Sequence, residues 1–334
     1  MAYDKQILSD LLREMEARRE ARSRLLAERR QEVYDRVPRI RQIDETLRGT
    51  AAAVLRAALE TGDDPTAAVE RLREQNLALQ RERVRLLTEA GLPADFLDDK
   101  PDCPLCDDNG YVGAEPCTCL KTRYAKRLTE QLSTILPIAD QNFEAFRLDY
   151  YSDVRDSRLG LSPRENMEAN LDLCAEYAHH FSAHSPNLLL FGSAGLGKTF
   201  LSTCIAKTVS ERGASVAYDT AIHVLGSYET VKFGGPDAAE AQHAIRKYEH
   251  ADLLILDDLG TELATAFTTS VFYSLLNTRL MARRPMIVNT NLQPNELEKR
   301  YSAAVASRLL GEFTHLRFFG EDIRQIKRRG GPRS

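Results

Sequence analysis

One short stretch, residues 192–199, restricts the fold of this 334-residue chain more than any other. It reads GSAGLGKT and matches the phosphate-binding pattern G-x-x-x-x-G-K-[ST] in full. The apolar run NLLLF precedes it at residues 187–191, and a segment with helical spacing begins at Phe200. Glycines allow the backbone angles that such a turn needs, and its N–H groups then form an anion site at a helix N-terminus. The sequence therefore predicts a strand, a phosphate-binding loop and a helix.

Within this loop, we expect the backbone and two side chains to hold a nucleotide and its metal ion. Lys198 can reach the β- and γ-phosphates, and the hydroxyl of Thr199 can bind Mg²⁺. The expected nucleotide-binding residues of this stretch are Gly192, Ser193, Ala194, Gly195, Leu196, Gly197, Lys198, Thr199 and Phe200. The alternative is a glycine turn that only connects a strand with a helix, and it leaves the lysine and the threonine unexplained.

A second motif, DLLILDD, follows at residues 252–258. An apolar strand that ends in two acids is the Walker B pattern, and it brings Asp257 to the strand's carboxyl end, next to the phosphate loop. There Asp257 can hold the hydration shell of Mg²⁺, and Asp258 can orient or deprotonate an attacking water molecule. The alternative is a buried strand that ends in acids by chance.

Three further apolar runs complete the pattern of a sheet, at residues 215–219, 286–290 and 315–319. Five apolar strands that alternate with helices predict a parallel α/β sheet, with ligands at the carboxyl ends of the strands. Asn291 follows one of these strands and can hydrogen-bond a γ-phosphate or its attacking water. Cys174 and Cys204 lie in helical segments, where we expect buried thiols.

Residues 1–91 are charged and rich in helix-forming residues, with narrow apolar stripes. We expect a helical region here, with Pro38 opening a helix and Gly91 ending the last one. Two interpretations stay open for it: a charged helical bundle that acts as a spacer, and an arm that docks a partner protein.

Residues 92–136 have a different composition, a loop-rich segment with two cysteine pairs and then a linker helix. Cys103 and Cys106 form C-P-L-C, and Cys117 and Cys119 form C-T-C. Two closely spaced pairs predict a tetrahedral Zn²⁺ site, and four thiolates leave no open position for chemistry, so the zinc would be structural. Redox-active thiols and unrelated surface cysteines are the alternatives.

Composition excludes several classes of protein. The net charge is −4, so the whole chain is not a basic nucleic-acid coat and any such contact must use local patches. No apolar run approaches the length of a transmembrane helix, and the N-terminus is too charged for a signal peptide. We therefore expect a cytoplasmic protein without a membrane partner.

Phe143 and Phe146 lie three residues apart before the phosphate loop. Core packing explains such a pair. In nucleotide-binding ATPases this approach to the loop also lies against the base, so Phe143 is a candidate contact of the nucleotide. Both interpretations stay open.

Together, these motifs resemble the AAA+ ATPases, and within them the DnaC/IstB group of bacterial helicase loaders and transposition helper ATPases. The resemblance covers residues 143–327. The motifs that carry it are GSAGLGKT (192–199), LLILDDLG (253–260), VNTNL (288–292), ASRLLG (306–311) and EDIRQIK (321–327). It implies an AAA+ domain over residues 137–334 that binds ATP or ADP with Mg²⁺ and hydrolyses ATP.

The resemblance also implies roles for individual residues. Asn291 matches the sensor-1 asparagine, Arg308 the arginine finger that reaches a neighbouring subunit's γ-phosphate, and Arg324 the sensor-2 arginine. For the two arginines, surface charge or a salt bridge is the alternative. A finger implies self-association through the ATPase domain. Asp258 departs from the wider pattern, where glutamate is common, and its shorter reach could slow hydrolysis.

Three functions remain after this comparison. A helical N-terminus followed by a cysteine-rich module resembles the loaders, which grip a hexameric replicative helicase and engage single-stranded DNA in replication. In that group an extra helix near residues 233–236 faces DNA, so Lys232, Arg246 and Lys247 could touch phosphates. The alternatives are a transposition helper of the IstB kind and a nucleotide-gated adaptor whose hydrolysis is incidental. A small-molecule kinase is disfavoured, because adjacent acids suit attack by water.

Overall fold

The computed structural model describes residues 4–50, 66–133 and 141–331 and divides them between two compact units. One unit contains residues 9–120, and the other contains the chain from residue 121 onward with the first few residues. Within the described ranges, no helix is long and apolar enough to cross a membrane. The three ranges expected from the sequence, 1–91, 92–136 and 137–334, stay a prediction.

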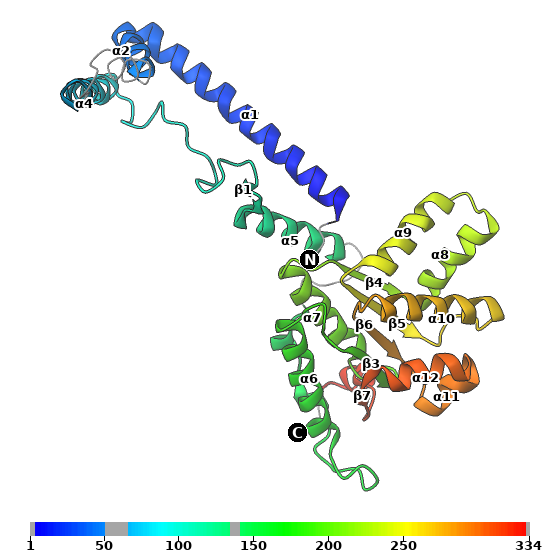
Figure 1. Cartoon of the computed structure of the whole chain (residues 1–334). Coiled ribbons are helices and arrows are strands. Elements are labelled where there is room, and N and C mark those ends of the chain that lie inside the picture. Colours follow the sequence, from blue (N-terminus) through cyan, green and yellow to red (C-terminus); the bar gives the residue numbers. More distant parts are fainter. Residues whose placement is uncertain (1–3, 51–65, 134–140, 332–334) are drawn as a thin grey trace. The chain divides into compact units, whose positions relative to one another are not determined.

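In the described part of the unit of residues 9–120, three helices and a small hairpin are present (Figure 1). The helices are α1 (Lys5–Arg36), α2 (Pro38–Arg48) and α4 (Thr66–Glu89), and the hairpin pairs β1 (Tyr111–Val112) with β2 (Glu115–Pro116). This confirms the helical N-terminal region, including the helix that begins at Pro38. Its apolar centre is formed by Val33, Ile40, Leu87 and Leu97, all of them buried. The sequence TGDDP at residues 61–65, where we expect a break between two helical segments, lies outside the described residues.

A five-stranded parallel sheet forms the centre of the second unit, as the sequence predicts. In spatial order its strands are β4 (Val216–Thr220), β5 (Leu253–Leu259), β6 (Met286–Thr290), β3 (Asn187–Gly192) and β7 (Phe313–Phe318). The residues of β3 alternate between two apolar clusters, with Leu188 and Leu190 on one face and Leu189 and Phe191 on the other. A parallel strand that is buried on both faces has no polar side, which explains the apolar runs in the sequence.

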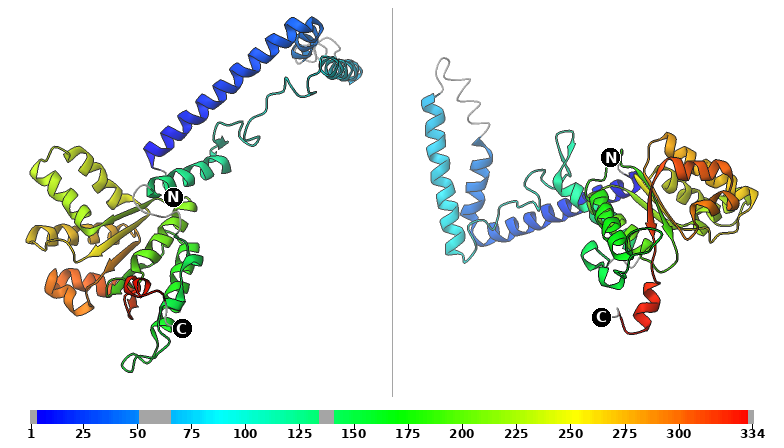
Figure 2. Two further views of the ribbon diagram at one scale, coloured as in Figure 1. Left: turned by 180° about the vertical axis from the view of Figure 1, so that it is seen from behind. Right: turned by 90° about the horizontal axis from the view of Figure 1, so that it is seen from below.

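Helices cover both faces of this sheet (Figures 1 and 2). One face packs against α6 (Pro163–His179) and α7 (Lys198–Glu211). The other packs against α8 (Ala221–Phe233), α9 (Ala238–His250), α10 (Ala266–Met281), α11 (Pro294–Arg300) and α12 (Ala303–Gly311). The remaining helices are α5 (Thr118–Ser133) and α13 (Ile323–Arg328), together with short 3-10 turns at Phe143–Ala145 and Leu148–Tyr150. Cys174 and Cys204 are buried, as expected.

Candidate functional site

The phosphate-binding loop lies between β3 and α7, at the carboxyl edge of the sheet, where its glycines are needed for close packing. Gly195 has a φ of 75°, and a Cβ added there would come within 1.9 Å of Asp322 Oδ1. At Gly192, with a φ of 140°, a Cβ would lie 2.0 Å from the carbonyl oxygen of Phe318. Both positions therefore exclude a side chain for steric reasons as well as for backbone conformation.

Lys198 begins α7 and has its ammonium group inside the loop. Its Nζ donates to the carbonyl oxygens of Gly192 (2.6 Å) and Ser193 (2.8 Å) and to Asn291 Oδ1 (2.8 Å). Burial lowers the pKa of Lys198 to about 8, although the nearby carboxylates of Asp257 and Asp258 oppose this effect. A buried cation among three oxygen atoms is suited to bind an anion, because a nearby phosphate would stabilise the protonated, charged form of the lysine.

Asp257 is buried at the end of β5 and accepts hydrogen bonds from three side chains. These come from the Tyr218 hydroxyl at 2.5 Å, the Asn289 amide at 2.9 Å and the Thr199 hydroxyl at 3.4 Å. Burial raises the pKa of Tyr218, so its hydroxyl stays protonated and donates. Thr199 and Asp257, the predicted Mg²⁺ residues, are thus adjacent, and their hydroxyl and carboxylate oxygens are ligands that Mg²⁺ prefers.

Asp258 turns out of the strand at this point. Its φ is 53°, and the pairing of β5 with β6 shifts register between Leu256 and Leu259. Burial raises the pKa of Asp258, and the neighbouring carboxylate of Asp257 adds to the effect. Aspartate tolerates this left-handed conformation better than most residues. A raised pKa also suits a group that exchanges a proton with water.

A cavity of about 540 Å³ opens beside the loop and collects most of the predicted nucleotide residues. Gly195 to Phe200, Asp258, Asn291 and Arg324 line it. The carbonyl of Gly195 accepts the N–H of Ile323 at 3.0 Å, which fastens the start of α13, and with it Arg324, to the phosphate-binding loop. Gly195 therefore connects the phosphate-binding loop with the helix that carries Arg324.

Aromatic side chains form one wall of this cavity. Phe146, Tyr151 and Phe200 line it, and the ring centroid of Phe146 lies 5.7 Å from that of Tyr151 and 5.6 Å from that of Phe200. Phe143 is not among the lining residues of the described chain; its ring lies 6.4 Å from His179 and packs against the core. The contact predicted between Phe143 and the base of a nucleotide stays a prediction. Phe146, which lines the cavity, lies where a contact with the base would form.

Arg308 lies on α12, away from the lining of this cavity. Its side chain is 43% exposed and makes a 3.5 Å ion pair with Glu312, the residue that follows the helix. The structure therefore contains the salt bridge that the sequence analysis gave as the alternative role of Arg308. An exposed pair of this kind is weak, so breaking it costs little.

Four cysteines form a second candidate site, in the unit of residues 9–120. The sulfur atoms of Cys103, Cys106, Cys117 and Cys119 all lie within 4.8 Å of one another. The N–H of Cys119 lowers the pKa of the Cys117 thiol to about 7. Four sulfur atoms at this spacing fit a tetrahedral zinc ion.

Asp108 supports this cluster, a role that the sequence did not indicate. Its carboxylate accepts the N–H groups of Cys103 (2.8 Å) and Asp102 (3.0 Å) and forms an ion pair with Arg22 of α1. Arg22 also contacts Asp99 at 2.8 Å. Within this unit, α1 is therefore fixed directly to the turn that carries the first cysteine pair.

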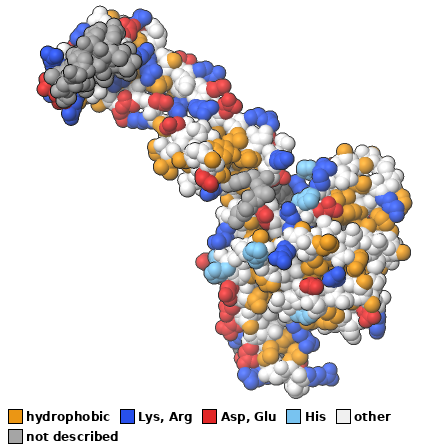
Figure 3. Space-filling model, in the orientation of Figure 1, with side chains coloured by type: hydrophobic (Ala, Val, Ile, Leu, Met, Phe, Trp, Pro, Cys, Tyr) orange, Lys and Arg blue, Asp and Glu red, His pale blue; other side chains and the backbone are white. Residues whose placement is uncertain are grey.

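The basic residues proposed for DNA contacts are exposed, but they do not form a dense patch. Arg246 and Lys247 lie on α9, and the Lys232 ammonium lies 4.1 Å from the ring centroid of Phe267. Phe233, beside Lys232, is 74% exposed. Basic and acidic side chains are interspersed over the face drawn in Figure 3.

The fold and these motifs define a P-loop domain of the AAA+ type. Residues 171–326 match the family model described as IstB-like ATP binding protein, and the similar curated proteins include both insertion-sequence ATP-binding proteins and DnaC helicase loaders. Among curated proteins it is 29% identical over 109 residues to an insertion-sequence ATP-binding protein of Mycobacterium tuberculosis, covering 33% of this chain and 42% of that protein. It is 22% identical over 139 residues to the replicative helicase loader DnaC of Escherichia coli K12, covering 42% of this chain and 56% of that protein.

The chain thus spans about half the length of these curated relatives. Among solved structures, the DnaC helicase loader is matched with a TM-score of 0.45 at 17% identity, over 55% of this chain and 99% of that one. DnaI is matched with a TM-score of 0.42 at 18% identity, over 56% of this chain and 93% of that one. At TM-scores below 0.5, these likenesses carry no functional conclusion.

Proposed function

We propose that this protein is an ATP-hydrolysing helicase loader of the DnaC type, which delivers a replicative helicase to single-stranded DNA. The observation that carries the ATPase part is the grouping of Lys198, Asp257, Asp258, Asn291 and Arg324 at one edge of the sheet. A helical unit with a four-cysteine cluster, separate from the ATPase domain, supports the loader part, because such a unit offers a surface for a partner.

In this proposal, each residue in or beside the cavity has its own role in ATP hydrolysis. The loop amides and Lys198 would bind the β- and γ-phosphates, while Thr199 and Asp257 would hold Mg²⁺, which neutralises charge on the phosphates when bound. Asp258 would orient the attacking water, and Asn291 would bind that water or the γ-phosphate. Arg324 lies in the same cavity, and Arg308 would complete the site of a neighbouring copy.

Two variants separate a motor from an adaptor that needs only bound nucleotide. Lys198→Ala should weaken nucleotide binding strongly, whereas Asp258→Asn should keep binding and lose hydrolysis. If helicase loading fails in both variants, hydrolysis is required. Loading that persists in Asp258→Asn would support the nucleotide-gated adaptor instead.

A transposition helper of the IstB kind is the second candidate. The similarity to insertion-sequence ATP-binding proteins of Mycobacterium tuberculosis and of Sinorhizobium fredii, the latter 31% identical over 105 residues, favours it. The full chain, used as bait with ATP against a replicative helicase and against a transposase, distinguishes the two. Retention of the helicase alone supports the loader, and retention of the transposase alone contradicts it.

A further inference from the structure

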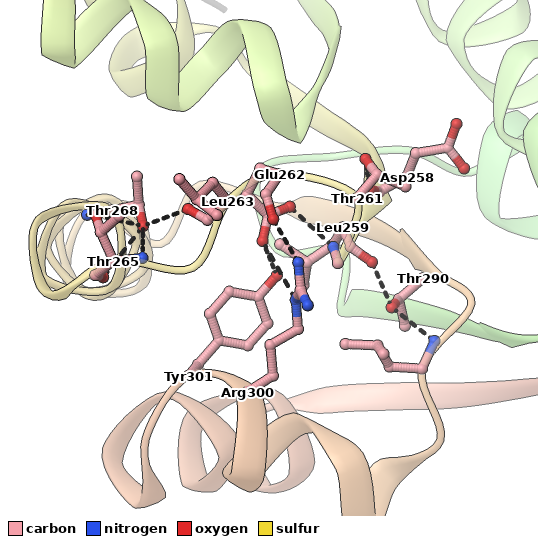
Figure 4. Close-up of polar contacts among 12 residues, drawn as sticks. Asp258, Leu259, Thr261, Glu262, Leu263, Thr265, Thr268, Thr290, Arg300 and Tyr301 are labelled. Carbon is pink, nitrogen blue, oxygen red and sulfur yellow. Dashed lines mark hydrogen bonds and ion pairs between the residues drawn. The ribbon is translucent and has the colours of Figure 1, made fainter.

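A buried carboxylate, Glu262, lies in the loop that joins β5 to α10 (Figure 4). Its side chain is 4% exposed. Oε2 accepts the N–H of Gly260 at 2.9 Å, and Oε1 accepts the Tyr301 hydroxyl at 2.5 Å. Nε of Arg300 lies 3.7 Å from Oε1, and the same guanidinium donates to the carbonyl of Glu262. Burying a charge is costly unless it is paired, so this carboxylate depends on Arg300 and Tyr301.

The same loop sets the conformation of Asp258. The hydroxyl of Thr261 donates to the Asp258 carbonyl at 2.8 Å, and the hydroxyl of Thr290 on β6 donates to the Leu259 carbonyl at 2.6 Å. These bonds hold the short segment between Asp258 and Glu262 from both sides, as Figure 4 shows. A shift of Glu262 would therefore change the position of the residue proposed to orient water.

On its other side, Glu262 holds the junction of α11 and α12. Arg300 is the last residue of α11, and Tyr301 follows it. Ser302 then starts α12, where its hydroxyl accepts the N–H of Val305 at 3.2 Å. Arg308 lies further along this nine-residue helix, less than two turns after Tyr301. The direction in which Arg308 points thus depends on how the junction is anchored.

From these contacts we infer that Glu262 is a positioning residue that links the water-orienting Asp258 of one copy to the arginine that the same copy donates to its neighbour. Glu262 does not line the nucleotide cavity, so it acts through other residues. Burial, and a smaller effect of Glu262, raise the pKa of Tyr301, so its hydroxyl stays protonated and donates to the carboxylate. The inference rests on the proposed function, because it requires that Arg308 completes a neighbouring site.

A mixing assay of two inactive full-length variants isolates this effect. Lys198→Ala cannot use its own site but still donates Arg308, and Arg308→Ala can use its site but donates nothing. Mixed together, they should hydrolyse ATP, because the first completes the site of the second. Failure of this baseline mixture, when wild-type protein hydrolyses ATP, would overturn the role of Arg308 and the inference with it.

In the decisive mixture, the double variant Lys198→Ala, Glu262→Gln takes the place of Lys198→Ala as the protein that donates Arg308. Its own site is already inactive, so any loss of hydrolysis reflects its Arg308. We expect activity at least about tenfold below the baseline mixture, with the KM for ATP unchanged, because the acceptor's site is intact. Activity equal to the baseline would show that Glu262 only stabilises the fold, and would refute the inference.

Two further donors guard against misfolding. Lys198→Ala with Tyr301→Phe removes a single hydroxyl at the junction and should also fail as a donor. If thermal unfolding shows that the Glu262→Gln variant is unfolded, this second donor takes its place. The matched control is Lys198→Ala with Glu249→Gln, since Glu249 accepts a 3.1 Å hydrogen bond from Tyr228 in another part of the same unit. That control should restore hydrolysis fully, and an equal loss there would also contradict a specific role for Glu262.

Discussion

At the scale of single residues, the site depends on a lysine that is easily neutralised. Lys198 is buried among carbonyl oxygens, and burial lowers its pKa to about 8. Phosphate groups around the ammonium would raise that pKa again. The charge of this one side chain therefore connects nucleotide binding to pH.

Nucleotide affinity should fall as the pH rises above about 8, by up to tenfold per pH unit, until the pKa of the bound state is reached. The sign follows from the shift: the bound state holds the proton more tightly, so binding is strongest where Lys198 is already charged. Titration with a fluorescent ATP analogue between about pH 7 and about pH 10 tests this. The weaker binding of Lys198→Ala should not show this slope, and the same slope in both proteins would contradict the explanation.

Gly195→Ala should remove nucleotide binding. The new Cβ would lie 1.9 Å from Asp322 Oδ1, and the side chain of Asp322 caps α13 by accepting the N–H of Arg324. The matched control is Gly160→Ala, which has a similar φ of 74° but no atom within 4 Å of the new Cβ. Each variant should lose about 1 kcal/mol of stability through backbone strain. Only Gly195→Ala should lose binding, and an equal loss in both would show that strain alone is responsible.

At the scale of elements, the sequence predicts the strands well because each is an apolar run between turn signals. Asp257 and the phosphate loop could be found because their motifs are local. Asn289 was missed, although a polar residue inside the run MIVNT is a signal. Its partner Asp257 lies on a different strand, and only the order of strands in the sheet makes them neighbours.

The same limit applies to the aromatic wall. Spacing could not decide which of Phe143 and Phe146 faces the cavity, because both belong to a segment of short 3-10 turns without a regular period. The contacts of Asp108 and Glu262 could not be predicted either, since acids in loops are common and their burial depends on partners distant in sequence. The positions of residues within local motifs were thus predictable, and contacts made by the fold were not.

Asn289→Ala should weaken the response to Mg²⁺. The change removes a 2.9 Å hydrogen bond from Asp257 and leaves a buried carboxylate with fewer donors. We expect a loss of about 1–3 kcal/mol in the free energy of unfolding, and about tenfold more Mg²⁺ for half-maximal hydrolysis. Asn170→Ala is the control, because Asn170 is also buried but binds the carbonyl of Arg317 at 2.8 Å. It should lower stability without changing the Mg²⁺ titration; a shared shift would argue against positioning of Asp257.

At the scale of the whole molecule, two units carry two kinds of chemistry. The nucleotide residues all lie in the unit that begins at residue 121, and the cysteine cluster lies in the unit of residues 9–120. Arg22 and Asp108 attach α1 to the cluster within its own unit. The metal should therefore stabilise the helical unit and leave the nucleotide site unaffected.

Purified protein should contain roughly one zinc ion per chain, and Cys103→Ser should lose it. Circular dichroism should then show reduced helix content, while binding of a fluorescent ATP analogue persists. Cys174→Ala removes a buried thiol outside the cluster and should keep the metal. A metal-free wild type, or full zinc content in Cys103→Ser, would contradict the assignment.

We propose that ATP is hydrolysed at a site that two copies of this chain complete together. The most direct measurement is the rate of ATP hydrolysis per chain as a function of protein concentration, for wild type and for Arg308→Ala. We predict that the wild-type rate per chain rises with concentration and reaches a plateau, while Arg308→Ala binds nucleotide normally and stays near the background. A rate per chain that is independent of concentration and is retained by Arg308→Ala would contradict the account.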